Sequence, residues 1–158
     1  MIQHAWTVLC TKCIVDPESR NATLVEVLDQ LNVPTPPGFP IIVPIQMDLV
    51  TAWFRGNPDV PERGTGRISL LMPDGSSTAA QEYVIDMTEF PRSRTITRSG
   101  GIIINGAGTY SFRVEVRDDG TADWRLAASL PLSVVLIEIA QPQHSAPAAE
   151  ARPSSAQA

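Results

Sequence analysis

The chain has 158 residues, of which 43% are hydrophobic and 18% charged, a composition typical of one water-soluble globular domain rather than of a disordered chain. Acidic residues outnumber Lys and Arg by 17 to 12, and the net charge of −5 argues against general nucleic-acid binding, which needs clustered cations. The N-terminus lacks the features of a signal peptide and no apolar run reaches the roughly 20 residues of a membrane helix, so we expect a cytoplasmic protein that binds neither nucleic acid nor membrane.

The first strand is expected around the Cys-x-x-Cys sequence of Cys10 and Cys13, which has apolar residues on both sides. Residues three apart on an extended strand point to opposite faces, so the two sulfurs should diverge. A zinc site would need further ligands, and the chain offers only His4, about 20 Å away along a strand, and His144 near the C-terminus. We therefore predict two reduced cysteines, at least one of them in the core, rather than a redox or metal site.

The next segment, residues 21–31, fits two patterns. Leu24, Val27, Leu28 and Leu31 have helical spacing, whereas the β-branched residues from Thr23 to Val27 alternate as in a strand. We predict a strand through about Val27 that forms a hairpin with the first strand, and a helical turn after it is the open alternative. Five prolines between residues 34 and 44 then predict a stiff extended connector.

The middle of the chain alternates apolar and polar residues with a period of two, which indicates strands with one face in the core. Asp74-Gly75 and Asp119-Gly120 mark turns between such strands, and no helical stretch separates them, so the sheets should be mostly antiparallel. Trp6, Trp53 and Trp124 fall in strand contexts that predict burial. The residues predicted to face the core are Ile45, Met47, Leu49, Trp53, Ile68, Leu70, Met72, Tyr83, Ile85, Met87, Tyr110, Phe112, Val114 and Val116.

A basic stripe is expected in the segment that follows residue 91, where Arg92, Arg94 and Arg98 share one parity. Such a stripe would suit an anionic partner, although Ile96 interrupts it. The simpler interpretation is that these charges protect an edge strand from pairing with another chain.

Two other features suggest chemistry less strongly. Asp118, Asp119 and Asp123 could hold calcium, but their spacing does not match the known twelve-residue loop, and Asp-Gly is already explained by a hairpin turn. The glycines at 106 and 108 precede a strand rather than a helix, so they do not form a phosphate site. No nucleophile–base set or paired-carboxylate motif can be assembled, which points away from catalysis.

The first strand and the last one, residues 131–139, are apolar on both parities. Both faces of such a strand are covered, either inside the domain or by a partner chain. From Gln141 onward the chain is rich in Ala, Pro and Ser, and we expect it to be disordered because it cannot bury enough apolar surface.

The Gly-x-Tyr-x-hydrophobic step at Gly108–Phe112 is similar to one in Greek-key sandwiches, in which the tyrosine hydroxyl pins a neighbouring connection, and Tyr110 is the candidate for that role. The order of "HAWTVLCTKCIVDPESRNATLVEVLDQL", "PIQMDLVTAWFR", "PDG", "GTYSFRVEVRDDGTADW" and "LPLSV", over residues 3–139, resembles a set of small uncharacterised bacterial proteins classed as a domain of unknown function. The resemblance implies a β-sandwich in a bacterium; it implies no activity and no site residue.

Together these patterns predict an all-β fold: a single antiparallel β-sandwich of Greek-key, immunoglobulin-like or C2-like type, with eight or nine strands over residues 1–140 and a disordered tail over residues 141–158. The leading functional hypothesis is a non-catalytic interaction or scaffold module without a cofactor, whose partner is a protein, which includes a second copy of the chain. The alternative is a small-ligand or metal-binding domain, enzymatic in one version, that uses Cys10, Cys13 and His4 or the Asp118–Asp123 loop.

Overall fold

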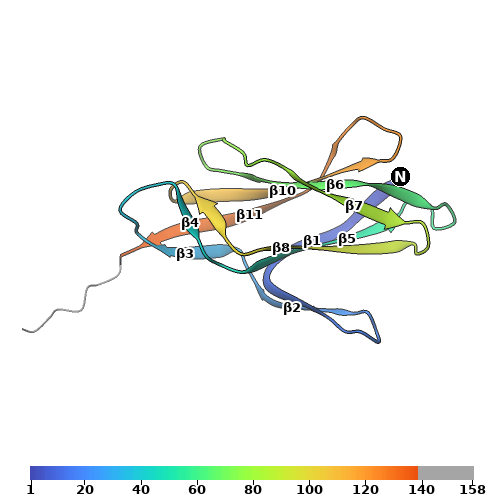
Figure 1. Cartoon of the computed structure of the whole chain (residues 1–158), viewed down its shortest axis with the longest axis horizontal. Helices are drawn as coiled ribbons and strands as arrows, with labels where there is room; N and C mark the ends of the chain where they lie inside the picture. Colours follow the sequence, from blue (N-terminus) through green and yellow to red (C-terminus); the bar gives the residue numbers. More distant parts are fainter. Residues whose placement is uncertain (139–158) are drawn as a thin grey trace, which may run out of the picture.

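The computed structural model describes residues 1–138, which form eleven β-strands and no helix (Figure 1). The all-β class is confirmed, but there are more strands than the predicted eight or nine. The predicted tail lies outside the described residues. Within residues 1–138 no helix is available that could cross a membrane. The strands are β1 (Ile2–Val15), β2 (Ala22–Val27), β3 (Gln30–Pro34), β4 (Ile41–Val43), β5 (Met47–Arg55), β6 (Glu62–Leu71), β7 (Gln81–Met87), β8 (Arg92–Ser99), β9 (Ile102–Ile104), β10 (Gly108–Asp118) and β11 (Arg125–Ile137).

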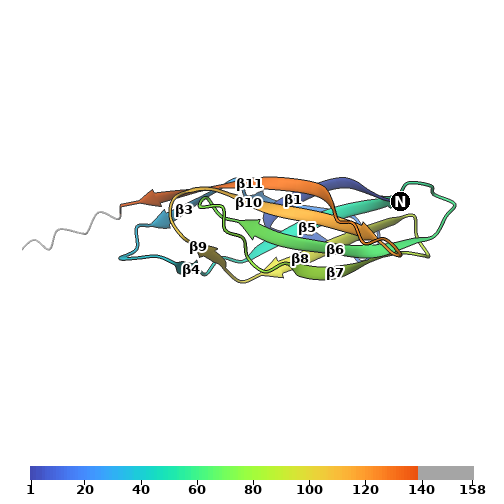
Figure 2. The ribbon, with the colours of Figure 1, turned by 90° about the horizontal axis from the view of Figure 1, so that it is seen from above.

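The strands form three sheets. A four-stranded sheet has the order β2-β1-β5-β8, a five-stranded sheet has the order β3-β11-β10-β6-β7, and β4 pairs with β9 in a short ribbon. The two larger sheets lie one above the other in Figure 1, and Figure 2 shows the five-stranded sheet from its own side. All pairs are antiparallel except β3 with β11, so the prediction of mostly antiparallel sheets is confirmed.

Strand β3 is where the sequence was misleading. The helical turn considered after Val27 does not form, and Leu31 instead pairs in parallel with Val134 of β11. The local spacing of apolar residues was compatible with a helix. In the structure, the backbone N–H and C=O groups of this segment form hydrogen bonds with the edge of β11 instead of with each other. The prolines that follow then lead the chain to β4 through an irregular stretch between residues 35 and 40.

The main core lies between the two larger sheets. Trp53 of β5 and Tyr110 of β10 are its largest fully buried side chains. Every residue predicted to face the core is either in this cluster or packed against it, which confirms the period-two interpretation. The prediction that all three tryptophans are buried was wrong, because Trp6 is 39% exposed and Trp124 precedes β11 on the outside of the five-stranded sheet.

Tyr110 has the role that the sequence indicated. Its hydroxyl donates a hydrogen bond to the carbonyl oxygen of Gly106 at 2.9 Å and accepts one from the backbone N–H of Asn105 at 2.8 Å. Gly106 has φ of 126°, a conformation that L side chains rarely adopt. The buried ring therefore fixes the connection that enters β10 and satisfies two of its backbone groups.

Candidate functional site

A cleft opens at one edge of the molecule, where the two larger sheets separate. β7 and β8 belong to different sheets and are joined by a short turn; they meet at this turn and diverge away from it (Figure 1). The end of the cleft at this turn is closed, and the Arg55 guanidinium stabilises it. Arg55 donates hydrogen bonds to the carbonyl oxygens of Met87 at 2.6 Å, Thr88 at 3.0 Å and Pro58 at 2.7 Å. At the open end the sheets leave a cavity of about 210 Å³.

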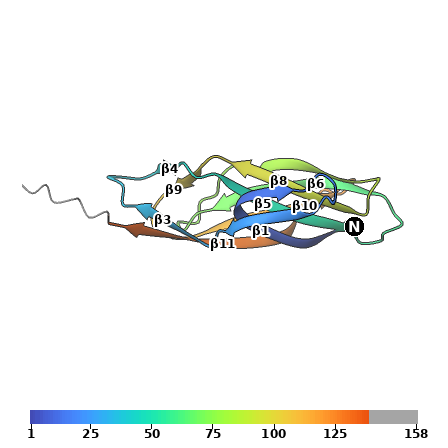
Figure 3. The ribbon, with the colours of Figure 1, turned by 90° about the horizontal axis from the view of Figure 1, so that it is seen from below.

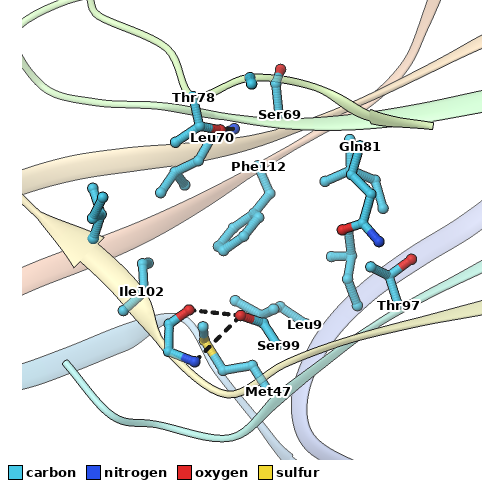
Figure 4. A pocket seen from close by; sticks show the side chains of 15 residues that line it. Leu9, Met47, Ser69, Leu70, Thr78, Gln81, Thr97, Ser99, Ile102 and Phe112 are labelled. Atoms are coloured by element: carbon cyan, nitrogen blue, oxygen red, sulfur yellow. Dashed lines mark hydrogen bonds between the residues drawn. The ribbon is translucent and has the colours of Figure 1, made fainter. Parts of the chain in front are cut away.

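The cavity has an apolar floor and a polar rim (Figure 4). Leu9, Met47 and Leu49 reach it from the four-stranded sheet, and Leu70 and Phe112 from the five-stranded sheet. The volume exceeds that of an engineered apolar cavity of about 150 Å³ that binds benzene. The space is therefore large enough for one apolar side chain or one small apolar molecule. The polar residues of the lining are Ser69, Thr78, Gln81, Thr97 and Ser99.

None of the residues that line the cavity is titratable. Two rim hydroxyls already have backbone partners: the Ser99 hydroxyl donates to the carbonyl oxygen of Gly101 at 2.6 Å, and Thr78 Oγ1 accepts from the N–H of Leu70 at 3.0 Å. A serine or threonine nucleophile needs an adjacent base, and no lining residue supplies one. The arrangement is suited to binding and contains no residue pair for acid–base or nucleophilic chemistry.

Strand β8 forms one wall of the cleft and is the last strand of its sheet. Thr97 and Ser99 lie opposite Leu49 and Met47 of β5 and face the cleft. Arg92, Arg94 and Arg98 lie on the other face of β8, as their parity predicted, and the expected edge position of the strand is also observed.

The three arginines differ in their contacts. Arg98 Nε lies 3.4 Å from Oδ1 of the buried Asp48, and Arg94 Nη1 donates to the carbonyl oxygen of Arg20 at 3.1 Å. Ile96, which interrupts the stripe in the sequence, packs into a small apolar cluster instead of facing solvent. Arg92 has no hydrogen-bond or ion-pair partner among residues 1–138. Part of the predicted stripe is therefore structural, and part of it is free.

The two cysteines were predicted to diverge, and this was wrong. β1 pairs with β5 only as far as Cys10, and from there to Val15 it pairs with β2 alone, so the strand leaves the sheet. Figure 1 shows the β1–β2 hairpin below the four-stranded sheet. Because of this bend, Cys10 and Cys13 pack in one cluster against Val50, with Ala22, Leu24 and Ile96 around it.

The predicted free and buried state of both cysteines is observed. Burial raises the pKa of both thiols, which keeps them protonated and poorly nucleophilic. His4 is not a third ligand, because its ring lies 5.6 Å from that of Trp53, in the main core, and its Nε2 is 2.7 Å from Thr7 Oγ1. Within the described part of the chain, no three His, Cys, Asp or Glu residues are grouped to hold a metal ion.

The Asp118–Asp123 loop has a structural role. Asp118 Oδ1 accepts a hydrogen bond from the N–H of Ile2 at 2.6 Å, and its Oδ2 accepts one from Arg125 at 2.8 Å. Gly120 has φ of 81°, as the predicted turn requires. The carboxylate that could have started a calcium site instead ties the first strand to the β10–β11 hairpin.

Sequence reasoning missed the cleft, because its residues come from strands that are far apart in the chain. One signal was present in the segment from Arg92 to Ser99. Its inward parity carries Ser93, Thr95, Thr97 and Ser99, so neither face of this strand is apolar. A strand whose inward-facing side chains carry hydroxyl groups indicates that the two sheets do not pack tightly against each other at that position.

No protein-family model matches the chain, and no curated protein matches it. The geometry of the cleft and of its edge strand therefore carries the functional argument.

Proposed function

We propose that this protein is a non-catalytic interaction module that receives an apolar side chain of a partner protein in the cleft between its two larger sheets. The observation that carries the proposal is the cleft itself: about 210 Å³, apolar at its floor, polar at its rim and free of titratable residues. Concave apolar sites with a few polar groups are the usual form of binding sites.

A partner protein fits this cleft better than a free molecule because β8 forms its wall. The edge of β8 that faces away from β5 carries backbone N–H and C=O groups, and such edges pair with extended segments of other chains. The cavity then supplies a place for a side chain of that segment.

The proposal extends to the fold type. We propose an immunoglobulin-like Greek-key sandwich from a bacterial, cytoplasmic protein, in line with the resemblance noted from the sequence. The hydroxyl contacts of Tyr110 and the parallel pairing of β3 with β11 support the Greek-key type.

Selection from a displayed library of random peptides, with the full chain as bait, tests the proposal. Ala79 lines the cleft and is exposed at its rim, so Ala79→Trp should cover the mouth, whereas Ala80→Trp places the same ring on the next residue, which does not line it. Selected peptides should bind the wild type and Ala80→Trp and lose affinity for Ala79→Trp. Peptides that bind all three proteins equally would contradict the proposal.

A small apolar ligand is the second candidate, favoured by the volume of the cavity. Mass spectrometry of small molecules extracted from the native wild-type protein and from Ala79→Trp distinguishes the two. A molecule that is retained stoichiometrically by the wild type alone would support this second candidate over the first.

A further inference from the structure

We infer that the partner segment binds as an additional extended strand along β8 and alternates apolar with acidic residues. The inference rests on the proposed function and names the chemistry of the partner. Three features of β8 lead to it: its free backbone edge, the cleft on its inner side and the arginines on its outer side.

The free edge comes first. β8 pairs with β5 over residues 92–99, and within residues 1–138 no strand pairs with its other side. Alternate backbone N–H and C=O groups of β8 therefore point outward, where an added strand can satisfy them. β7 and β8 meet at the turn that joins them and diverge away from it (Figure 1), and β8 lies at the upper edge of the four-stranded sheet in Figure 3. Thr97 and Ser99, in the half of β8 far from the turn, line the cleft, and this half is called the open half.

The face of β8 that lines the cleft determines where the partner segment carries apolar residues. Thr95, Thr97 and Ser99 point inward, opposite Thr51, Leu49 and Met47 of β5. Side chains directly opposite each other on paired strands share one face of the sheet. A residue of the added strand opposite Thr97 would thus point into the cavity, toward Leu9 and Phe112.

The arginines on the outer face of β8 determine where the partner segment carries acidic residues. Arg98 points outward from the open half and Arg92 and Arg94 from the half nearer the turn, and the Arg98 side chain is 66% exposed. The one carboxylate against the stripe in the described residues is that of Asp48, which is buried and lies 3.4 Å from Arg98. The stripe is thus locally basic in a chain of net charge −5, and outward carboxylates on an added strand would complement it.

Edge protection and selective recognition are compatible. Charges on an edge strand discourage pairing with neutral or basic segments, and the same arginines favour an acidic one. The chain's own residues 141–158 do not fit this pattern, because they include one Glu, one Arg and no large apolar residue.

Three synthetic seven-residue peptides test the inference by titration calorimetry with the full chain. The first alternates Asp with Leu, the second alternates Lys with Leu, and the third is the first peptide with methylated backbone nitrogens along one edge. The Asp peptide should bind at least about tenfold more tightly than the Lys peptide, and more weakly at high salt. Methylation should abolish binding, because it removes the hydrogen bonds of the added strand.

Matched charge reversals locate the site. Arg94→Glu should weaken binding of the Asp peptide about tenfold, and Arg113→Glu on the outer face of the five-stranded sheet should leave it unchanged although the net charge is the same. Because Arg94 also contacts Arg20, a thermal melt must show that this variant is folded. Arg98→Gln removes a charge from the open half of β8 and offers a second test, with the same melt as control because Arg98 contacts Asp48.

The outcomes separate the two proposals. If library peptides bind in an Ala79-dependent way but Asp and Lys peptides bind equally or not at all, the interaction module stands and the inference is overturned. If methylation has no effect, the added strand is overturned. If light scattering shows a dimer that Arg94→Glu dissociates, the occupant is a second copy of the chain and the inference of a separate partner is wrong.

Discussion

The outer faces of the two larger sheets differ in how far the chain itself covers them. The four-stranded sheet covers part of its outer face with its own chain: the β1–β2 hairpin bends over it and buries Cys10, Cys13 and Val50 in a second small core. The five-stranded sheet leaves its outer face to solvent. There Trp124 contacts both Arg67 and Arg117, whose guanidinium carbons are 4.2 and 4.6 Å from the ring centroid.

The two faces are therefore stabilised by different polar contacts. On the covered face, Asp48 connects the β1–β2 hairpin to the sheet, because its Oδ2 accepts a hydrogen bond from the backbone N–H of Cys13 at 2.8 Å. Its Oδ1 lies 3.4 Å from Nε of Arg98. On the open face, Arg67 binds Glu115 through two contacts of 2.8 and 3.1 Å. The buried carboxylate should contribute more to stability than the partly exposed ion pair, because solvent screens the ion pair. The predictions below test that inequality.

The largest effect is expected at Asp48. Asp48→Ala should destabilise the protein by about 2–3 kcal/mol, because it leaves the Cys13 amide without a partner in a buried site. Asp48→Asn keeps an acceptor for this amide and should cost less. Urea unfolding measures both, and equal losses in the two variants would contradict the proposed role of the hydrogen bond.

The covered face should also respond to alkaline pH. Burial raises the pKa of Cys10 and Cys13 in the folded protein, so the folded state disfavours their ionisation. The stabilisation is complete below the unfolded pKa of about 8.5 and is lost as the pH rises through the folded value. Wild-type stability should therefore fall above about pH 8.5 more steeply than that of the Cys10→Ala/Cys13→Ala double variant. Parallel pH curves for the two proteins would show that the thiols are not the cause.

On the open face, Trp124→Ala should cost about 1 kcal/mol, since two partly exposed cation–π contacts are lost. Trp124→Phe keeps an aromatic face and should lose about half as much. Thermal unfolding of both variants provides the measurement. A loss as large as that of Asp48→Ala would break the contrast between the two faces.

The smallest effect is expected at the ion pair. Glu115→Gln should cost about 0.5–1 kcal/mol at pH 7. The hydrogen bonds from Arg67 lower the pKa of Glu115, so this contribution is present above the unfolded pKa of about 4.3 and is lost as the pH falls through the folded value. The stability difference between wild type and Glu115→Gln should shrink as the pH falls below about 4.3. A gap that persists there would mean that the pair acts through packing rather than charge.

Much of the fold could be predicted from local patterns. The alternation at Tyr110, Val114 and Val116 specified a strand and its buried face, because side chains on a strand point to opposite sides at every step. The turn glycines Gly75 and Gly120 were predictable for a similar local reason, since both adopt positive φ. The apolar residues on both parities of β1 also indicated a covered second face, and this is confirmed at Cys10 and Cys13. The same prediction for the last strand was wrong, because Val135 and Ile137 on the second face of β11 are exposed.

The candidate site was less predictable, and its residues show why. The parity of Arg92, Arg94 and Arg98 and the edge position of their strand were inferred from the sequence, but their unequal contacts were not. Arg94 reaches the carbonyl of a residue that lies 74 positions earlier in the chain. Cys10 and Cys13 pack in one cluster because β1 leaves β5 after Cys10, and an idealised straight strand contains no such change of direction.

The amino-acid sequence alone determined that the chain forms strands, which side chains point inward along most of them, and where tight turns occur, because these properties depend on neighbours within a few residues. Only the tertiary structure decided that segment 30–34 pairs as β3, that the β1–β2 hairpin covers an outer sheet face, and that a cleft remains between the sheets beside β8. These features depend on backbone edges and side chains that meet from distant parts of the chain, and no local pattern contains that information.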